Sequence, residues 1–385
     1  MSEFELSLDQ LKTVQDLFRS RILEGLQAEG KEIGALATYL GLPDGRQAGR
    51  ALVVDTGGTN MRVALVELSS NNGVILSGPI TDNVPSGRSG QPLSAEEFFS
   101  AQARLSLKLD PKPDSLPLGY CFSYPTQNSP DGDALLLRWT KGLRIDGVVG
   151  SPVGSALQKR LSDIGIATGR VVVLNDTVAS LLGGVHLNAE PRFGCNYIGL
   201  ILGTGTNMAG VFSPAQMSKV EFDSPMIANL ESGNFSCPFL TAFDDELDAE
   251  SDHPGSQRFE KAVSGRYLPQ LFDKVCPGHD LGDNTAKLVA LRDAGEGQAG
   301  RVAARLLRRS ARLAAAGLGA VASLYSPDHA TSVLAEGGLL WGDSQFAPTV
   351  RETLKELHPD RTIELVPQRE NVNLLGAACA ALSTP

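Results

Sequence analysis

The chain has 385 residues, more than the roughly 100–200 residues of one ordinary domain, so its length indicates two or three domains. Its 42% hydrophobic and 20% charged residues are typical of a globular protein with a large core, which excludes wholesale disorder. The net charge of −10 provides no basic surface for nucleic acid or an anionic membrane, so we expect neither as a partner.

The predicted elements begin with apolar residues at helical spacing over 5–40, which indicate one or two amphipathic helices. An apolar strand follows over 51–54, and strands over 62–68 and 74–80 are expected to join at an Asn72-Gly73 hairpin turn. Further along, predicted helices alternate with short apolar strands, which indicates an α/β class. These helices are expected over 94–108, 150–163, 256–274, 299–325 and 343–357, and these strands over 116–122, 170–174, 197–202, 332–335 and 363–366.

Three features bear on the compartment and the surface. The five cysteines are dispersed and form no C-x-x-C pair, so neither a disulfide framework nor a zinc site is predicted. The acidic N-terminal segment lacks the basic and apolar regions of a signal peptide, and no apolar run reaches the about 18–20 residues of a membrane span. We therefore expect a cytoplasmic protein, in which the dense charge run at 244–252 is a solvated loop.

One short sequence repeat bears on the domain organisation. The tetrapeptide Gly-Thr-Asn-Met at 58–61 occurs again at 205–208, each time between two predicted strands. The shared strand–turn–strand setting indicates two similarly built lobes, each contributing one glycine turn to a common cleft.

The first glycine turn, over 55–60, follows a buried strand, and its glycines allow the backbone to bend sharply and direct amides at an anion. It has neither the Gly-Lys-Ser/Thr of a P-loop nor the G-x-G-x-x-G dinucleotide fingerprint. A carboxylate such as Asp55 at the edge of a core strand is costly unless it is paired or binds a hydrated metal ion such as Mg²⁺. These features favour an ATP–Mg²⁺ site over a tight turn without a ligand.

The strand over 171–174 ends in Asn175-Asp176, and two interpretations of Asp176 are open. It could be the N-cap of the following helix. Alternatively, it could be a general base for an alcohol, with Asn175 binding a neighbouring hydroxyl. The segments at 123–125, 139–142 and around Glu231 and Glu260 are weak signals on their own, because turns and surface ion pairs explain them equally well.

Seven segments, read together in chain order, resemble the hexokinase family of ATP:hexose phosphotransferases, which includes glucokinases. The segment Asp55-Thr56-Gly57-Gly58-Thr59-Asn60-Met61-Arg62 is similar to the family's D-L-G-G-T-N-F-R. The other segments lie at 25–45, 122–125, 139–142, 174–179, 203–207 and 248–268, so the resemblance covers nearly the whole chain.

The resemblance implies an α/β fold of the actin-like ATPase (ribonuclease H-like) type, in which a hexose and MgATP meet in a central cleft. The small lobe would contain 50–175 and a C-terminal helix at 372–385, and the large lobe 1–49 and 176–371. The implied reaction is phosphorylation of the 6-hydroxyl of a hexose, with glucose as the first candidate and mannose or fructose as further ones. The implied assembly is a monomer or homodimer.

The resemblance also assigns roles to residues. Asp176 would be the catalytic base, and Lys141 a second catalytic residue that contacts sugar and partly offsets phosphate charge. The sugar would be bound by Ser123, Thr140, Lys141, Asn175, Asp176, Asn207, Glu231 and Glu260. The phosphates and Mg²⁺ would be surrounded by Asp55, Gly57, Gly58, Thr59, Asn60, Gly205 and Thr206, with Asp55 reaching the metal through water and Gly337 and Gly338 on the adenosine side.

The chain departs from the family pattern at three places. Ser232 replaces the aromatic residue of the E-W-G motif, the segment at 266–270 differs from M-Y-L-G-E, and the segment beginning at Asn371 lacks D-G-S-G. A separate alternative function is a sugar sensor that keeps the fold and has lost phosphoryl transfer. Retention of Asp176, Lys141 and both glycine turns argues against this alternative.

Overall fold

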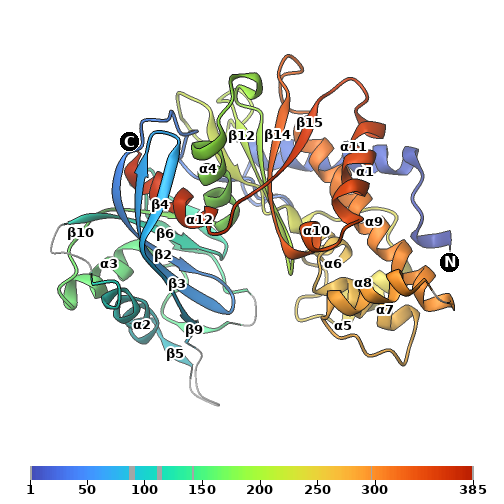
Figure 1. Cartoon of the computed structure of the whole chain (residues 1–385), viewed down its shortest axis with the longest axis horizontal. Coiled ribbons are helices and arrows are strands. Elements are labelled where there is room, and N and C mark those ends of the chain that lie inside the picture. The colour runs from blue at the N-terminus through green and yellow to red at the C-terminus, as the bar shows by residue number, and fades with distance from the viewer. Residues whose placement is uncertain (1, 86–91, 111–114, 141–142, 296, 384–385) are drawn as a thin grey trace.

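Two β-sheets with helices on both faces build the molecule, as Figure 1 shows. The computed structural model describes residues 2–85, 92–110, 115–140, 143–295 and 297–383. Within these ranges, no helix combines the length and the apolar character that crossing a membrane requires.

The first sheet has five strands in the spatial order β10-β6-β2-β3-β4. Their bounds are β2 (Gly49–Thr56), β3 (Asn60–Ser69), β4 (Asn72–Asn83), β6 (Leu116–Phe122) and β10 (Thr168–Leu174). Strand β2 pairs antiparallel with β3 and parallel with β6. The consecutive apolar residues at 51–54 are all buried, as expected for a strand that is covered on both faces.

The second sheet has six strands in the order β1-β13-β12-β11-β14-β15. Their bounds are β1 (Leu36–Ala37), β11 (Tyr197–Leu202), β12 (Thr206–Phe212), β13 (Met226–Asn229), β14 (Thr331–Glu336) and β15 (Ile363–Pro367). Two small ribbons, β5 (Leu93–Ser94) with β9 (Ile145–Asp146) and β7 (Thr126–Asn128) with β8 (Ala134–Leu136), complete the described strands.

Both sheets repeat one topology. In each sheet a three-strand antiparallel meander (β2-β3-β4 or β11-β12-β13) is extended by two parallel strands beside its first strand, which are β6 and β10 or β14 and β15. The repeated tetrapeptide begins in the β2–β3 turn and in the β11–β12 turn, which are equivalent positions. The expectation of two similarly built halves agrees with this shared topology, whereas the boundaries of the two lobes stay a prediction.

The α-helices pack on the faces of the sheets or, as α5, α7 and α8 do, mainly on other helices. Their bounds are α1 (Leu8–Gln27), α2 (Ala95–Leu107), α3 (Val153–Asp163), α4 (Asp176–Asn188), α5 (Ala242–Glu250), α6 (Arg258–Val263), α7 (Tyr267–Val275), α8 (Thr285–Ala294), α9 (Gly297–Ala322), α10 (Gly338–Gly342), α11 (Phe346–Leu357) and α12 (Val372–Leu382). Short 3₁₀ helices lie at Ser2–Phe4, Pro191–Phe193 and Ser232–Asn234.

Helices α4 and α12 lie between the two sheets. Helix α12 packs on β2 and β6, α4 packs on β11 and β14, and the two helices pack on each other. Their contact is close at Gly376, where a Cβ atom would lie 1.7 Å from the carbonyl oxygen of Ala179. Glycine at this position therefore allows the helix backbones to approach, and a larger residue would force them apart.

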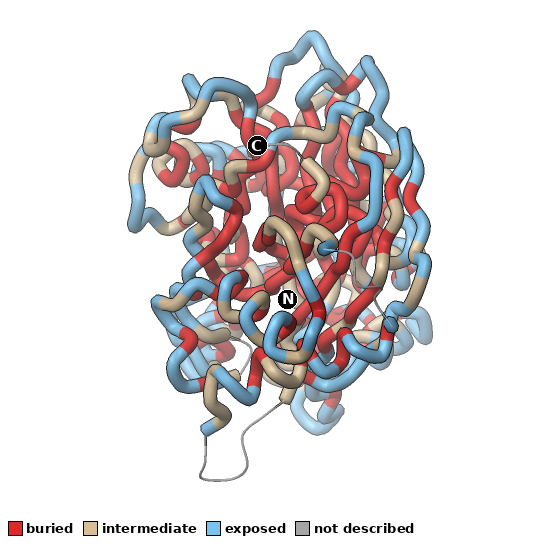
Figure 2. The backbone as a smooth tube through the Cα atoms, turned by 90° about the vertical axis from the view of Figure 1, so that its left-hand side faces the viewer, coloured by how far each residue is buried: buried red, intermediate tan, exposed pale blue. Residues whose placement is uncertain are grey.

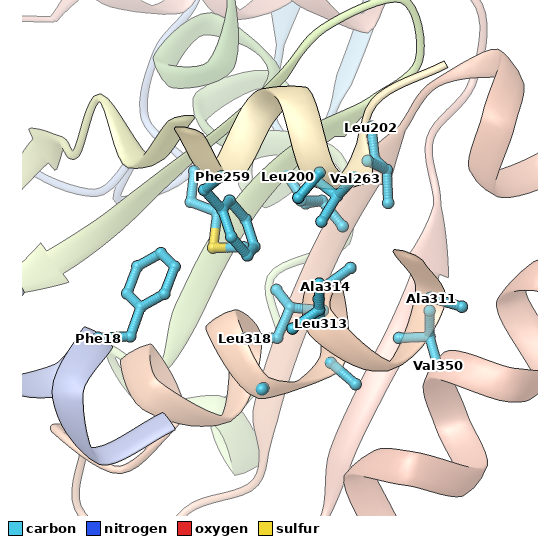
Figure 3. Close-up of a cluster of buried hydrophobic side chains, with 14 of the residues drawn as sticks. Phe18, Leu200, Leu202, Phe259, Val263, Ala311, Leu313, Ala314, Leu318 and Val350 are labelled. Atoms are coloured by element: carbon cyan, nitrogen blue, oxygen red, sulfur yellow. The ribbon is translucent and has the colours of Figure 1, made fainter. Parts of the chain in front are cut away.

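The largest core lies on the outer face of the second sheet. Helices α1, α9 and α11 pack there, and Figure 2 shows the buried backbone running through the interior. In Figure 3, Phe259 and Val263 of α6 point towards Ala314 and Leu318 of α9. The core thus fixes one face of the short helix α6, and the opposite part of this helix reaches the cavity described below.

Three local expectations are wrong. Residues 244–252 are not a solvated loop, because 242–250 form α5, in which Asp244 and Asp248 are buried. The helix expected over 256–274 is interrupted around Gly265, whose N–H donates to the carbonyl oxygen of Gly203 at 2.7 Å. The β3–β4 hairpin exists, but Ser69 pairs with Asn72, so the turn lies at 70–71 rather than at Asn72-Gly73.

Candidate active site

A cavity of 590 Å³ opens where the strand ends of both sheets meet. The predicted site residues that line it are Gly58, Thr59, Ser123, Thr140, Asn175, Asp176, Gly205, Thr206, Asn207, Glu231, Glu260, Gly337 and Gly338. Several of them follow directly after β6, β10 and β14, and the carboxyl ends of parallel strands are the usual ligand sites of α/β sheets. Residues that are far apart in sequence are thereby brought to one place.

Asp176 lies in the first turn of α4 and lines this cavity. The N-cap is the preceding residue, Asn175, whose Oδ1 accepts a hydrogen bond from the N–H of Thr177 at 2.9 Å. The carboxylate of Asp176 accepts from the same N–H at 2.7 Å. The interpretation of Asp176 as the N-cap is therefore wrong.

A chain of amides connects α4 to the second sheet. The Nδ2 of Asn207 donates to Asn229 Oδ1 at 2.7 Å and to Asn175 Oδ1 at 3.4 Å. The Nδ2 of Asn229 in turn donates to Glu231 Oε1 at 2.8 Å. Asn229 is buried and was not predicted, because its place in the network depends on the pairing of β12 with β13.

Glu260 closes the second glycine turn. Its Oε2 accepts a hydrogen bond from the N–H of Thr206 at 2.9 Å. A Cβ atom on Gly205 would lie 2.8 Å from the same oxygen, so a side chain at 205 would displace the carboxylate. Gln257 lies one helical turn before Glu260 and also lines the cavity. This turn and the Glu260 carboxylate therefore form one unit.

The first glycine turn lies against the segment after β6. The hydroxyl of Tyr124 donates to the carbonyl oxygen of Gly57 at 2.6 Å, and the N–H of Ser123 donates to that of Thr56 at 3.1 Å. Of the predicted phosphate residues, Gly58 and Thr59 line the cavity, whereas Asp55, Gly57 and Asn60 are described but are not in its lining. Within the turn, the N–H of Gly57 donates to the carbonyl oxygen of Asn60 at 2.9 Å.

Asp55 is paired with an arginine. Its Oδ2 accepts hydrogen bonds from Arg62 Nε at 2.9 Å and from Asn373 Nδ2 at 3.2 Å, and Arg62 also donates to Asn371 Oδ1 at 2.9 Å. The described residues contain no group of three or more His, Cys, Asp or Glu side chains arranged to hold a metal ion. This donor set fits only a Mg²⁺ ion that arrives with most of its ligands from phosphate and water.

A further part of the cavity wall is formed by the residues at and after the end of β14. Gly337 has a φ of 129°, and a Cβ atom on it would lie 2.0 Å from the carbonyl oxygen of Leu202, so this position needs glycine. Next to it, burial raises the pKa of the Glu336 carboxyl, and the nearby negative charge of Asp176 raises it further. Cavity residues to which the sequence assigned no role include Arg138, Gln257, Arg266 and Glu336.

Lys141, the second predicted catalytic residue, lies outside the described residues. Its neighbours Arg138 and Thr140 line the cavity, and the ring of Trp139 packs edge-on against Tyr124 with centroids 4.9 Å apart. The indole N–H of Trp139 donates to Ile145 O at 3.0 Å. Trp139 is therefore held beside the cavity, where it can report on binding.

Comparison with solved structures identifies the fold. A hexokinase from Schistosoma mansoni, solved in complex with glucose, has a TM-score of 0.82 and 25% identity, with 99% of this chain and 96% of that chain covered. A ROK family glucokinase from Streptomyces griseus, solved with glucose and AMPPNP, has a TM-score of 0.56 and 21% identity over 86% of this chain and 98% of that chain. The expectation of an actin-like ATPase fold is confirmed.

Proteins with similar sequences point to the same family as the solved structures. Hexokinase-2 from Candida albicans is 31% identical over 70% of this chain and 58% of its own length, and hexokinase-3 from Rattus norvegicus is 35% identical over 71% of this chain and 30% of its own. The chain thus covers less than two thirds of each of these two relatives. One family model described as hexokinase matches 1–186, and a second with the same description matches 197–277 and 297–383. Because the two matches together cover most of the chain, this protein belongs to the hexokinase family.

Proposed function

We propose that this protein transfers the γ-phosphoryl group of ATP to the 6-hydroxyl of a hexose, with glucose as the first candidate and mannose or fructose as others. The observation that carries the proposal is the position of Asp176, a carboxylate in the first turn of α4 that faces a cavity lined by polar residues from both sheets. Family membership and the glucose complex of a relative support it.

A hexose presents several hydroxyl groups, each of which can donate and accept a hydrogen bond. The cavity provides side chains of both kinds, and the proposed sugar ligands are Ser123, Thr140, Lys141, Asn175, Asp176, Asn207, Glu231 and Glu260. The Asn207–Asn229–Glu231 network fixes the orientation of the amides before the sugar arrives. Such preorganisation lowers the entropy that binding has to overcome.

Asp176 is the proposed general base. As the 6-oxygen of the sugar forms its bond to the γ-phosphorus, the bond from that phosphorus to the bridging oxygen of ADP breaks. The hydroxyl proton passes to the Asp176 carboxylate. Phosphoryl transfer depends mainly on positioning and charge neutralisation, and the amides of the cavity and the proposed Lys141 contact provide both.

The two glycine turns, at 57–60 and 203–206, are the proposed phosphate sites, and Gly337 and Gly338 are the proposed adenosine side. Their backbone amides suit an anion, because glycine allows a phosphate to approach closely. Asp55 would contact Mg²⁺ through water. When bound, this ion would neutralise charge on the phosphates and leave the protein residues to orient the sugar.

The decisive experiment is a coupled assay with ATP against glucose, mannose, fructose, glucosamine and N-acetylglucosamine. Sugar binding is measured in parallel by the fluorescence of Trp139, which lies beside the cavity. Turnover with a hexose supports the proposal. Binding of a hexose without turnover would favour the sugar sensor. The cytoplasmic location and the monomeric or homodimeric state stay predictions.

A further inference from the structure

We propose that the buried ion pair between Asp248 and Lys261 is a positioning unit that sets sugar affinity by holding the start of α6, and with it Glu260, in place. This inference rests on the proposed function, because it takes Glu260 as a sugar ligand. Neither Asp248 nor Lys261 lines the cavity, so both would act through another residue.

The pair is almost fully enclosed. Asp248 is 7% exposed and Lys261 is 4% exposed, and Lys261 Nζ lies 2.6 Å from Asp248 Oδ1. The other carboxylate oxygen, Oδ2, accepts a hydrogen bond from the N–H of Gly255 at 2.8 Å and lies 3.1 Å from Nη1 of Arg258, the first residue of α6. Lys261 Nζ also donates to the carbonyl oxygen of His253 at 2.8 Å. Both members of the pair therefore bind the backbone of the loop that connects α5 to α6.

This connecting loop is otherwise exposed. Residues 252–256 all lie at the surface, and the loop ends at Gln257, which has a φ of 54°. A non-glycine residue in this left-handed region is held there by its surroundings. The two buried side chains supply such surroundings, since they bind the loop at His253 and Gly255.

The loop leads directly into the cavity wall. Gln257, the N-cap residue of α6, and Glu260, in the first turn of this helix, both line the cavity. The core fixes one face of α6 through Phe259 and Val263, as Figure 3 shows. The Asp248–Lys261 pair fixes the N-terminal end of the same helix. Without it, the turn that carries Glu260 can shift while the core contacts remain.

The chain provides a matched control on the same helix. Asp244, one turn before Asp248 in α5, pairs with Arg309 of α9 at 2.7 and 2.8 Å. This pair is equally buried, with Asp244 4% and Arg309 1% exposed. In the described structure Asp244 hydrogen-bonds with Thr241 and Arg309 instead of with the loop. Removal of the Asp244–Arg309 pair therefore measures how the loss of a buried ion pair affects stability and glucose affinity when the contacts at the start of α6 are kept.

The experiment compares Lys261→Met with Arg309→Met in the whole chain of 385 residues. Glucose affinity is measured by Trp139 fluorescence, affinity for MgAMPPNP by calorimetry, and thermal stability by circular dichroism. Both variants should unfold at a lower temperature, because each removes the most buried cation that pairs with a buried carboxylate. Lys261→Met should weaken glucose binding by about tenfold or more and AMPPNP binding less, because Glu260 reaches the proposed phosphate turn only through the N–H of Thr206. Lys261→Arg should restore most of the glucose affinity, and Arg309→Met should leave it within about twofold.

Paired variants cover the case in which a single change prevents folding. Asp248→Leu with Lys261→Met, and Asp244→Leu with Arg309→Met, remove both charges of a pair and avoid an unpaired one. The proposal is overturned if glucose affinity is unchanged in the first double variant, or if it falls equally in the second. Wild-type protein that binds no hexose would instead overturn the proposed function. Wild-type protein that binds glucose without turnover keeps the positioning role and favours the sensor.

Discussion

At the scale of single residues, a substitution of Asp176 can separate the loss of turnover from the loss of sugar binding. Replacing it by Asn keeps the size of the side chain and an oxygen that can accept from the N–H of Thr177. The fold and sugar binding should therefore survive. We expect kcat to fall by roughly 10²–10⁴, which is the usual cost of losing a general base.

Steady-state kinetics and Trp139 fluorescence on the same preparation of Asp176→Asn measure both quantities. Near-normal turnover at neutral pH would remove Asp176 from the mechanism. A parallel loss of glucose binding would show that its main contribution is to hold the sugar.

We expect a small side chain to affect glucose affinity differently at Gly205 and at Gly338, which both line the cavity. A Cβ atom at 205 would lie 2.8 Å from Glu260 Oε2, whereas one at 338 would have no heavy atom within 4 Å. We expect Gly205→Ala to weaken glucose binding by about tenfold, because Glu260 must move, and Gly338→Ala to leave it within about twofold. Titration with glucose in the absence of ATP measures both effects, and equal affinities in the two variants would contradict the link between Gly205 and Glu260.

The sequence could predict those site residues that lie in recognisable motifs. Asn175, Asp176 and Thr206 follow or open strands with clear apolar patterns, so their clustering at strand ends was expected. Asn229 has no such signal, because it lies within β13 and gains its role only from the neighbouring strand. Arg138 and Arg266 were missed for a related reason, since an exposed arginine on a loop has the same pattern whether or not it faces a cavity.

At the scale of elements, α5 explains why a dense acidic run can be a helix. Asp244 and Asp248 are four residues apart, so they lie on one face, and each meets a buried cation, Arg309 or Lys261. The partner of Asp244 lies 65 residues away in the chain, so local charge density could not reveal it. Helices with long apolar periodicity, such as α2 and α9, were predicted within a few residues because their own sequence determines the buried face.

The buried carboxylate of Asp244 predicts the acid stability of the protein. Burial alone would raise its pKa, but hydrogen bonds and charge attraction from Arg309 hold the pKa below the ordinary value of 3.8. Its pKa is thus lower in the folded than in the unfolded chain, so its contribution to stability is present above pH 3.8 and is lost as the pH falls through the folded-state pKa.

Melting temperatures measured from pH 6 down to about pH 3 on wild type and on the Asp244→Leu, Arg309→Met double variant test this contribution. The melting temperature of wild type should fall more steeply at the acid end. Parallel curves for the two proteins would mean that other carboxylates dominate the acid response.

At the scale of the whole molecule, the cavity takes its wall from both sheets. Ser123 and Thr140 follow strands of the first half of the chain, whereas Asn207, Glu231 and Glu260 belong to the second. A sugar that contacts both sets binds a closed arrangement better than an open one, and this difference in affinity shifts the equilibrium. We therefore expect glucose alone, without ATP, to bring the two proposed lobes together.

Small-angle scattering with and without saturating glucose should show a smaller radius of gyration for the sugar-bound protein. ATP hydrolysis in the absence of sugar should be far slower than transfer, because water does not complete the closed cleft. An unchanged scattering profile during normal transfer would contradict closure. A non-phosphorylatable sugar analogue serves as the control, since it should close the lobes without turnover.

The position of α12 has a consequence for how the protein is made. The first sheet is complete at Leu174, yet the helix that covers its inner face begins only at Val372. A ribosome adding 5–20 residues per second needs roughly 10–40 s to synthesise the intervening stretch of about 200 residues. During that time the apolar face that receives Leu374, Ala377 and Ala378 has no covering helix. The nascent chain therefore passes through a prolonged stage in which this half is open to aggregation and is a natural substrate for chaperones that bind exposed apolar surface.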